Sequence, residues 1–202
     1  MIVKVCGMRE AQNIREVEAL GIDLMGFIFY PRSPRYCAAL PDYLPVRCKR
    51  VGVFVNASID DIRERTATFG LDYIQLHGNE TPDFAQLVRE QTGCKIIKAF
   101  SIGNPFPGEL VASFEGEADL FLFDTPTVGF GGSGQTFDHS LLAQYTGNTP
   151  FLLSGGIGPD FQLTTSHEQL AGLDLNSRFE TEPGLKDTKL LRSFISKLKT
   201  TH

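Results

Sequence analysis

Short runs of β-branched and aromatic residues recur roughly every 22 to 31 residues along this 202-residue chain. Segments with helical spacing of apolar residues separate most of these strand-like runs. Because strands and helices alternate, we expect parallel strands joined by right-handed crossovers. The expected strands are residues 2–6, 24–29, 50–55, 72–76, 95–100, 119–123, 150–154 and 173–176, and the expected helices are 9–20, 58–69, 81–92, 159–170 and 187–198.

Eight such units in about 200 residues predict a closed (β/α)8 barrel, also called a TIM barrel, at the short end of the size range of that fold. An open doubly wound sheet is the alternative, although it normally needs fewer strands. No linker or low-complexity tract divides the chain, so we expect one α/β domain over residues 1–202. The second unit contains Pro31, Pro34, Pro41 and Pro45, which leave room only for a short or distorted helix near residues 38–44.

Composition limits the classes of function. The chain is 42% hydrophobic and 21% charged, as is usual for a soluble globular protein. Its net charge of −5 argues against a nucleic-acid partner. No apolar run is long enough to span a bilayer and no signal peptide is recognised, so we expect a cytoplasmic protein. The four cysteines show no CxxC or zinc spacing, which favours free thiols and no metal site.

The carboxyl ends of the strands are where barrel enzymes carry their chemistry. Cys6 ends the first expected strand, and alternation places Lys4 on the same face, where its ammonium could lower the pKa of the thiol. The alternative is that Cys6 is simply a small buried hydrophobic residue. Asp124 follows an apolar strand, where partial burial would raise its pKa and make it a proton donor. Alternatively, Asp124 opens a turn.

Other strand ends carry groups suited to binding. His77 follows the fourth strand, although a lone histidine is more often structural. Arg35 lies in a proline-stiffened loop after the second strand, where a fixed guanidinium suits a carboxylate. Gly155 and Gly156 follow the seventh strand ahead of an expected helix, and Ser177 follows the eighth. These two neighbouring loops predict a phosphate site, with the helix dipole contributing.

The loop after Asp124 contains GFGGSG, a formal match to the glycine pattern of dinucleotide-binding proteins. Its first glycine, Gly129, falls five residues after Asp124, too far to form the tight turn directly after the strand. About 20 residues beyond the pattern, the chain offers no acidic residue to hold a ribose. We therefore interpret the match as accidental and the glycines as giving the loop freedom to approach a substrate, as a lid would.

Several ordered segments resemble the phosphoribosylanthranilate isomerase family of tryptophan biosynthesis. VKVCGM resembles the K-I-C-G-I segment of that family, and GFIFYPRSPRY resembles G-F-x-F-x-x-x-S-P-R-Y. VGVFVN, IQLHGNE and KAF follow in order. FDTPTVGFGGSGQTFD, LSGGI and LDLNSRFETEPGLKD are similar to the later family segments, so that the resemblance covers nearly the whole chain.

The resemblance implies a barrel that performs an Amadori rearrangement of N-(5-phosphoribosyl)anthranilate without a cofactor or metal. Carried over by motif, Asp124 would be the general acid and Cys6 the general base. Arg35 would bind the anthranilate carboxylate, with His77 also in the substrate site. Gly155, Gly156 and Ser177 would bind the phosphate. A monomer is expected, with a dimer as the alternative.

Four positions depart from the family pattern. Asn176 replaces a serine and Arg178 a glycine near the expected phosphate loop; Gln135 and His139 stand where lysine and tryptophan are frequent. Two other functions remain open at this point. One is the analogous sugar isomerase of histidine biosynthesis, which has a carboxylate in place of Cys6. The other is a non-catalytic barrel that binds a phosphorylated metabolite.

Overall fold

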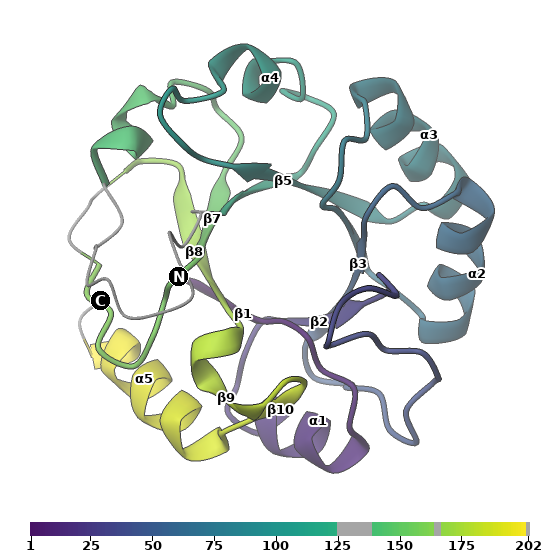
Figure 1. Ribbon diagram of the computed structural model, residues 1–202, viewed down its shortest axis with the longest axis vertical. Helices are drawn as coiled ribbons and strands as arrows, with labels where there is room; N and C mark the ends of the chain where they lie inside the picture. Colours follow the sequence, from purple (N-terminus) through teal and green to yellow (C-terminus); the bar gives the residue numbers. More distant parts are fainter. Residues whose placement is uncertain (125–138, 164–166, 201–202) are drawn as a thin grey trace.

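Eight parallel strands close into a barrel in the computed structural model, which describes residues 1–124, 139–163 and 167–200. Figure 1 looks into this ring. Each strand pairs with its neighbours in sequence, and the first pairs with the last. The closed sheet confirms the predicted fold class. The strands are β1 (Ile2–Val5), β2 (Leu24–Ile28), β3 (Lys49–Phe54), β4 (Tyr73–Leu76), β5 (Lys95–Ser101), β6 (Leu120–Asp124), β7 (Phe151–Ser154) and β8 (Leu170–Leu175).

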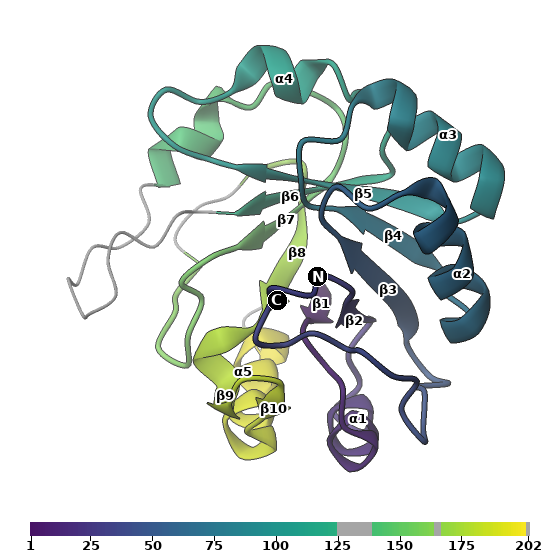
Figure 2. The same cartoon turned by 45° about the vertical axis from the view of Figure 1, so that its right-hand side comes forward.

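Helices surround the strands on the outside (Figures 1 and 2). After β8 the chain makes a short 3-10 helix and a two-stranded hairpin, and then α5 returns beside α1. In the described part of the chain, no helix is long and apolar enough to cross a membrane. The helices are α1 (Ala11–Glu18), α2 (Ile59–Phe69), α3 (Pro82–Thr92), α4 (Gly108–Ala112) and α5 (Thr188–Thr200); η1 (His139–Gln144) and η2 (Ser177–Phe179) are 3-10 helices, and β9 (Glu180–Glu182) and β10 (Leu185–Lys186) form the hairpin.

Local sequence signals explain where α2 and α3 begin and end. The Ser58 hydroxyl accepts a hydrogen bond from the Asp61 amide, and the Thr81 hydroxyl accepts one from the Phe84 amide. Both helices end at a glycine in the left-handed region, with φ of 57° at Gly70 and 69° at Gly93. The capping residues supply acceptors for amides that a helix leaves unpaired, and glycine takes this backbone conformation without steric cost.

Two expected helices are not observed in the described residues. Turns and bends connect β2 to β3, so the second unit is irregular as predicted but forms no helix, in keeping with its four prolines. The helix expected over residues 159–170 is wrong for 159–163 and 167–170, which contain turns and extended backbone. The Thr-Thr-Ser run at residues 164–166 explains the failure, because such residues compete with helix formation. Neither α4 nor the hairpin was predicted.

The core has two parts that the barrel wall separates. Inside the barrel, alternate strand residues pack together, chiefly Leu24, Val51, Ile97, Ala99, Leu120, Leu122 and Leu152. A larger cluster fills the space between the outer faces of the strands and the helices. This alternation is what aims the last inward residue of each strand at the mouth of the barrel.

A buried ion pair fastens the loop after β4 to β5. The Lys98 ammonium lies 2.9 Å from Glu80 Oε2, and both side chains are 3% exposed. Lys98 also donates to the carbonyl oxygen of Gly78 at 2.7 Å. Glu80 accepts from the amides of Asn56 and Gly78. Burial acts to raise the pKa of Glu80, but these hydrogen bonds outweigh it and hold the pKa below its usual value. The carboxylate is therefore ionised and paired at neutral pH.

We expect Lys98→Met to lower the free energy of unfolding by about 3–5 kcal/mol, because it leaves the Glu80 carboxylate buried without its cation. Denaturant unfolding at pH 7 measures the change. The control is Lys95→Met, which removes an exposed lysine from the same strand and should change stability by no more than about 0.5 kcal/mol. Equal stabilities of the two variants would contradict a structural role for the Lys98 pair.

Candidate active site

One cavity of about 530 Å³ opens at the carboxyl ends of the strands. That volume lies in the range of small-molecule sites. The cavity is lined by every one of the site residues predicted from the sequence: Cys6, Arg35, His77, Asp124, Gly155, Gly156 and Ser177. The strand order explains this convergence, because each residue lies at the end of a parallel strand of the closed barrel or in the loop that follows it.

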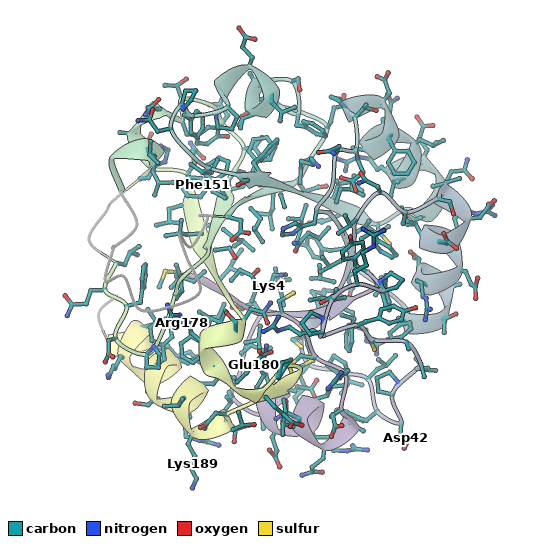
Figure 3. All side chains as sticks on the ribbon, viewed as in Figure 1. Lys4, Asp42, Phe151, Arg178, Glu180 and Lys189 are labelled. Atoms are coloured by element: carbon teal, nitrogen blue, oxygen red, sulfur yellow. The ribbon has the colours of Figure 1, made fainter. Side chains whose placement is uncertain are left out.

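Cys6 lies beside a buried ion pair that joins the first and last strands. The register of β1 and β8 places Lys4 opposite Asp174, and the Lys4 ammonium lies 2.9 Å from Asp174 Oδ1. The Lys4 side chain is 0% exposed and projects into the barrel (Figure 3). Burial disfavours its charge, but Asp174 and Cys6 more than compensate and raise the pKa of Lys4. Lys4 is therefore a fixed cation next to the thiol.

The thiol is nevertheless protonated in the free protein. Burial raises the pKa of Cys6, and the attraction of Lys4 offsets this effect only in part; Asp174 adds to the rise. The expectation that Lys4 would lower the pKa of Cys6 was right about the sign of its influence but wrong about the net result. The reason is that a fully buried thiol loses the hydration that stabilises a thiolate.

Asp124 faces a neutral histidine across the cavity. His77 Nε2 lies 3.9 Å from Asp124 Oδ2. Burial raises the pKa of Asp124 and lowers the pKa of His77, so each group favours its uncharged form more than it would in water. The Gln75 amide nitrogen lies 2.8 Å from His77 Nδ1. An amide that donates to Nδ1 places the ring proton on Nε2, the nitrogen that faces Asp124.

Arg35 reaches the cavity with part of its guanidinium already paired. Its Nε donates to both oxygens of Glu180 at 2.9 Å, and its Nη2 donates to Oε2 at 2.6 Å. Glu180 also accepts from the Lys186 ammonium at 2.6 Å. Burial lowers the pKa of Lys186 and the pair with Glu180 raises it. Burial has the larger effect, so the pKa of Lys186 lies below its usual value. This end of the cavity therefore holds two cations and one anion.

The loops after β7 and β8 form one end of the cavity. Gly155 and Gly156 have φ of 86° and 66°, a backbone conformation that favours glycine. Ser177 and Arg178 line the cavity from the other loop. Residues 159–163, which directly follow Gly158, form a turn and no helix, so these residues supply no helix dipole to the site. Arg178 instead brings a positive charge to the cavity.

The residues that were not among the sequence candidates include Asp174, which lines the cavity, and Glu180 and Lys186, which support Arg35. Asp174 had a usable signal, since it lies on the same strand face as Asn176, two residues before the strand end. Glu180 and Lys186 had none, because their pairing depends on the hairpin. The loop of residues 125–138, with the glycine pattern, the expected lid and Gln135, lies outside the described residues, as does the side chain of His139.

The closed barrel and this cavity define a (β/α)8-barrel enzyme of the acid–base type, with groups suited to an anionic small molecule. Residues 3–197 match the family model described as N-(5'phosphoribosyl)anthranilate (PRA) isomerase. The chain belongs to that family. It is accordingly an isomerase that rearranges N-(5'-phosphoribosyl)anthranilate in tryptophan biosynthesis.

Individual relatives support the membership of this chain in the isomerase family. The chain is 50% identical over 202 residues to N-(5'-phosphoribosyl)anthranilate isomerase of Phocaeicola vulgatus, covering 98% of both proteins. A crystal structure of the enzyme from Thermotoga maritima is 30% identical, with a TM-score of 0.81 and coverage of 99% of this chain and 100% of that one. Another structure, 28% identical with a TM-score of 0.80, is a complex with reduced 1-(o-carboxyphenylamino)-1-deoxyribulose 5-phosphate; it covers 99% and 100% of the two chains.

We expect Asp124→Asn to be slightly more stable than the wild type at pH 7. The raised pKa means that ionising Asp124 is less favourable in the folded protein than in the unfolded chain. At pH values above that pKa, the ionised carboxylate therefore lowers the stability of the folded protein. The advantage should vanish as the pH falls through the raised pKa toward the ordinary value of 3.8. Since the side chain is 39% exposed, solvent screening keeps the difference below about 1 kcal/mol.

Urea unfolding at a series of pH values measures this difference. Asp160→Asn removes an exposed carboxylate outside the cavity and should show no comparable pH dependence. An Asp124→Asn protein that is less stable than the wild type at pH 7 would show that the carboxylate is stabilised, not destabilised, by its surroundings.

Proposed function

We propose that Asp124 is the general acid and Cys6 the general base of the rearrangement. The observation that carries this proposal is the placement of a carboxyl with a raised pKa and a thiol beside a buried ammonium on two separate strands around one cavity. Along the barrel, β6 is three strands from β1, so the two groups can approach a sugar from different sides. Ring opening and proton abstraction need an acid and a base in such an arrangement.

In the first step, Asp124 donates its proton to the ring oxygen of the furanose. The bond between that oxygen and C1' breaks, and the nitrogen lone pair forms the C1'=N bond of a protonated Schiff base. The raised pKa of Asp124 supports this role, because the acid retains its proton closer to neutral pH than an exposed aspartate would. Neutral His77, with its Nε2 proton facing Asp124, binds the substrate and stabilises the aspartate once it is ionised.

In the second step, the Cys6 thiolate removes the proton from C2'. The C2'–H electron pair forms a C1'=C2' bond, and the nitrogen recovers its lone pair to give an enolamine, which tautomerises to the ketone. The thiol is protonated in the free protein, so its proton passes to solvent before this step; Lys4 and Lys186 both favour the resulting thiolate, and Lys4 does so at short range.

The remaining groups bind the two anionic ends of the substrate. Arg35 binds the anthranilate carboxylate, and Gly155, Gly156 and Ser177 bind the phosphate. The left-handed glycines and the open position of Ser177 beside them support the phosphate assignment. The complex of the relative with a reduced phosphorylated product analogue agrees with a phosphorylated substrate. We further propose that residues 1–202 act as one domain and as a monomer in the cytoplasm.

Cys6→Ala and Asp124→Ala should each lower kcat by about 10²–10⁴, the usual contribution of a proton-transfer group. The assay follows the loss of fluorescence of freshly made phosphoribosylanthranilate with purified protein. Cys48→Ala removes a half-buried thiol outside the cavity and is the control, with kcat within about twofold of wild type. If both cavity variants keep a kcat near that of the wild type, the assigned roles are wrong.

A further inference from the structure

The guanidinium of Arg35 has two usable edges, and the protein occupies one of them. Glu180 accepts from Nε and Nη2, which form the side edge. A guanidinium carries five N–H donors in a rigid plane, so two hydrogens on Nη1 and one on Nη2 remain after this pairing. One hydrogen of Nη1 and the remaining hydrogen of Nη2 form the end edge, which can still bind a carboxylate through two parallel hydrogen bonds. The pairing with Glu180 therefore leaves Arg35 able to bind a ligand carboxylate, and limits how it can do so.

Glu180 is itself held in place and cannot follow Arg35. Its side chain is 4% exposed, and its Oε1 accepts from Lys186 Nζ at 2.6 Å and from the Gly184 amide at 3.1 Å. Figure 3 shows Glu180 on the hairpin, beside the barrel mouth. Lys186 in turn exchanges backbone hydrogen bonds with the Asn13 side chain, at 2.8 and 2.9 Å. These contacts fix the hairpin to α1 and give Arg35 a rigid anchor.

The aliphatic part of Arg35 is fixed independently. Gly7, next to Cys6, has φ of 80°, and a Cβ at this position would lie only 2.8 Å from Arg35 Cδ. The same Cβ would lie 3.0 Å from Asn176 Oδ1. Glycine at position 7 thus lets the arginine pass close to the backbone that carries the thiol. The stem and one edge of the side chain are both constrained, and only the end edge remains for a ligand.

We propose that Glu180 is a positioning residue that orients Arg35 toward the aromatic carboxylate of the substrate. The inference deepens the proposed function and rests on the carboxylate-binding role given there to Arg35. Arg35, Lys186 and Glu180 together carry one net positive charge, enough to attract a single carboxylate. Glu180 therefore acts in two opposite ways: it improves the geometry of the arginine and reduces the positive charge that the ligand meets.

These opposite effects make Glu180→Gln a sharp test. If orientation dominates, the variant should raise KM for phosphoribosylanthranilate about tenfold, the scale of a weakened hydrogen bond to a charged group, with kcat within about threefold. A carboxylate bound equally in substrate and transition state affects KM without changing kcat. If charge alone matters, the variant gains a positive charge and KM should fall. An unchanged or lower KM would overturn the proposal.

Glu182→Gln is the matched control, because it removes the same charge from an exposed position on the same hairpin. Its KM should stay within about twofold of wild type. Inhibition by inorganic phosphate separates a local effect from general damage. Its inhibition constant should be the same in Glu180→Gln as in the wild type, and an equal loss of phosphate and substrate affinity would count against positioning.

A double variant addresses folding. Glu180→Gln leaves Lys186 buried without its anion, so Glu180→Gln with Lys186→Met removes both charges and should recover thermal stability. It should not recover KM, because Arg35 still lacks its anchor. Recovery of the wild-type KM in this double variant would assign the effect to the unpaired Lys186 and contradict the proposal.

A measurement without turnover distinguishes this proposal from the proposed function. The Arg35 Nε proton, paired with Glu180, should exchange with solvent at least about tenfold faster in Glu180→Gln, as followed by NMR of the guanidinium Nε–H group. If the wild type fails to turn over phosphoribosylanthranilate while this difference holds, the proposed function fails and the positioning role stands. If turnover is normal but the exchange rate is unchanged, the positioning role fails.

Discussion

The pairing of the first strand with the last is the constraint on which the rest of the structure depends. It closes the barrel, and the register places Lys4 of β1 directly opposite Asp174 of β8. An ammonium and a carboxylate in an apolar interior are costly to bury unless they meet, and here they meet at 2.9 Å. The same ion pair lies directly beneath the thiol, so the strand pairing that closes the barrel also places the charges that act on Cys6.

Charge is distributed around the cavity in an ordered way. Lys4 and Asp174 compensate each other below Cys6, while Arg35, Glu180 and Lys186 leave one positive charge at the neighbouring side. On the opposite wall, Asp124 and His77 both favour neutral forms. A molecule with a carboxylate at one end and a phosphate at the other would therefore meet cations or backbone amides at its ends and the acid–base groups Cys6, Asp124 and His77 near its middle.

The barrel and the seven predicted site residues that line the cavity could be found from the sequence, for a simple physical reason. Strand alternation assigns a face to each residue, and the end of a parallel strand assigns a place, so Asp124 and His77 follow from local pattern alone. The net effect of burial on Cys6 could not be predicted, since it depends on the surroundings of the thiol as well as on the nearby Lys4. Glu180 and Lys186 carried no local signal, because their partners lie far away in the sequence. The prediction of a helix after Pro159 was wrong because it relied on the apolar spacing and gave too little weight to the low helix propensity of the Thr-Thr-Ser run.

The hairpin that holds Arg35 is synthesised late, after most of the residues that line the cavity. A ribosome makes the chain from the amino terminus, and domains fold as their parts emerge. A nascent chain of about 170 residues already contains Cys6, Arg35 and Asp124, but it lacks Asp174 and Glu180, the partners that fix two sides of the cavity. The chemical groups of the site are thus synthesised early and acquire their final environment only with the last part of the chain. Incomplete products of translation would carry the reactive residues without Asp174 and Glu180, the partners that fix the geometry of the cavity.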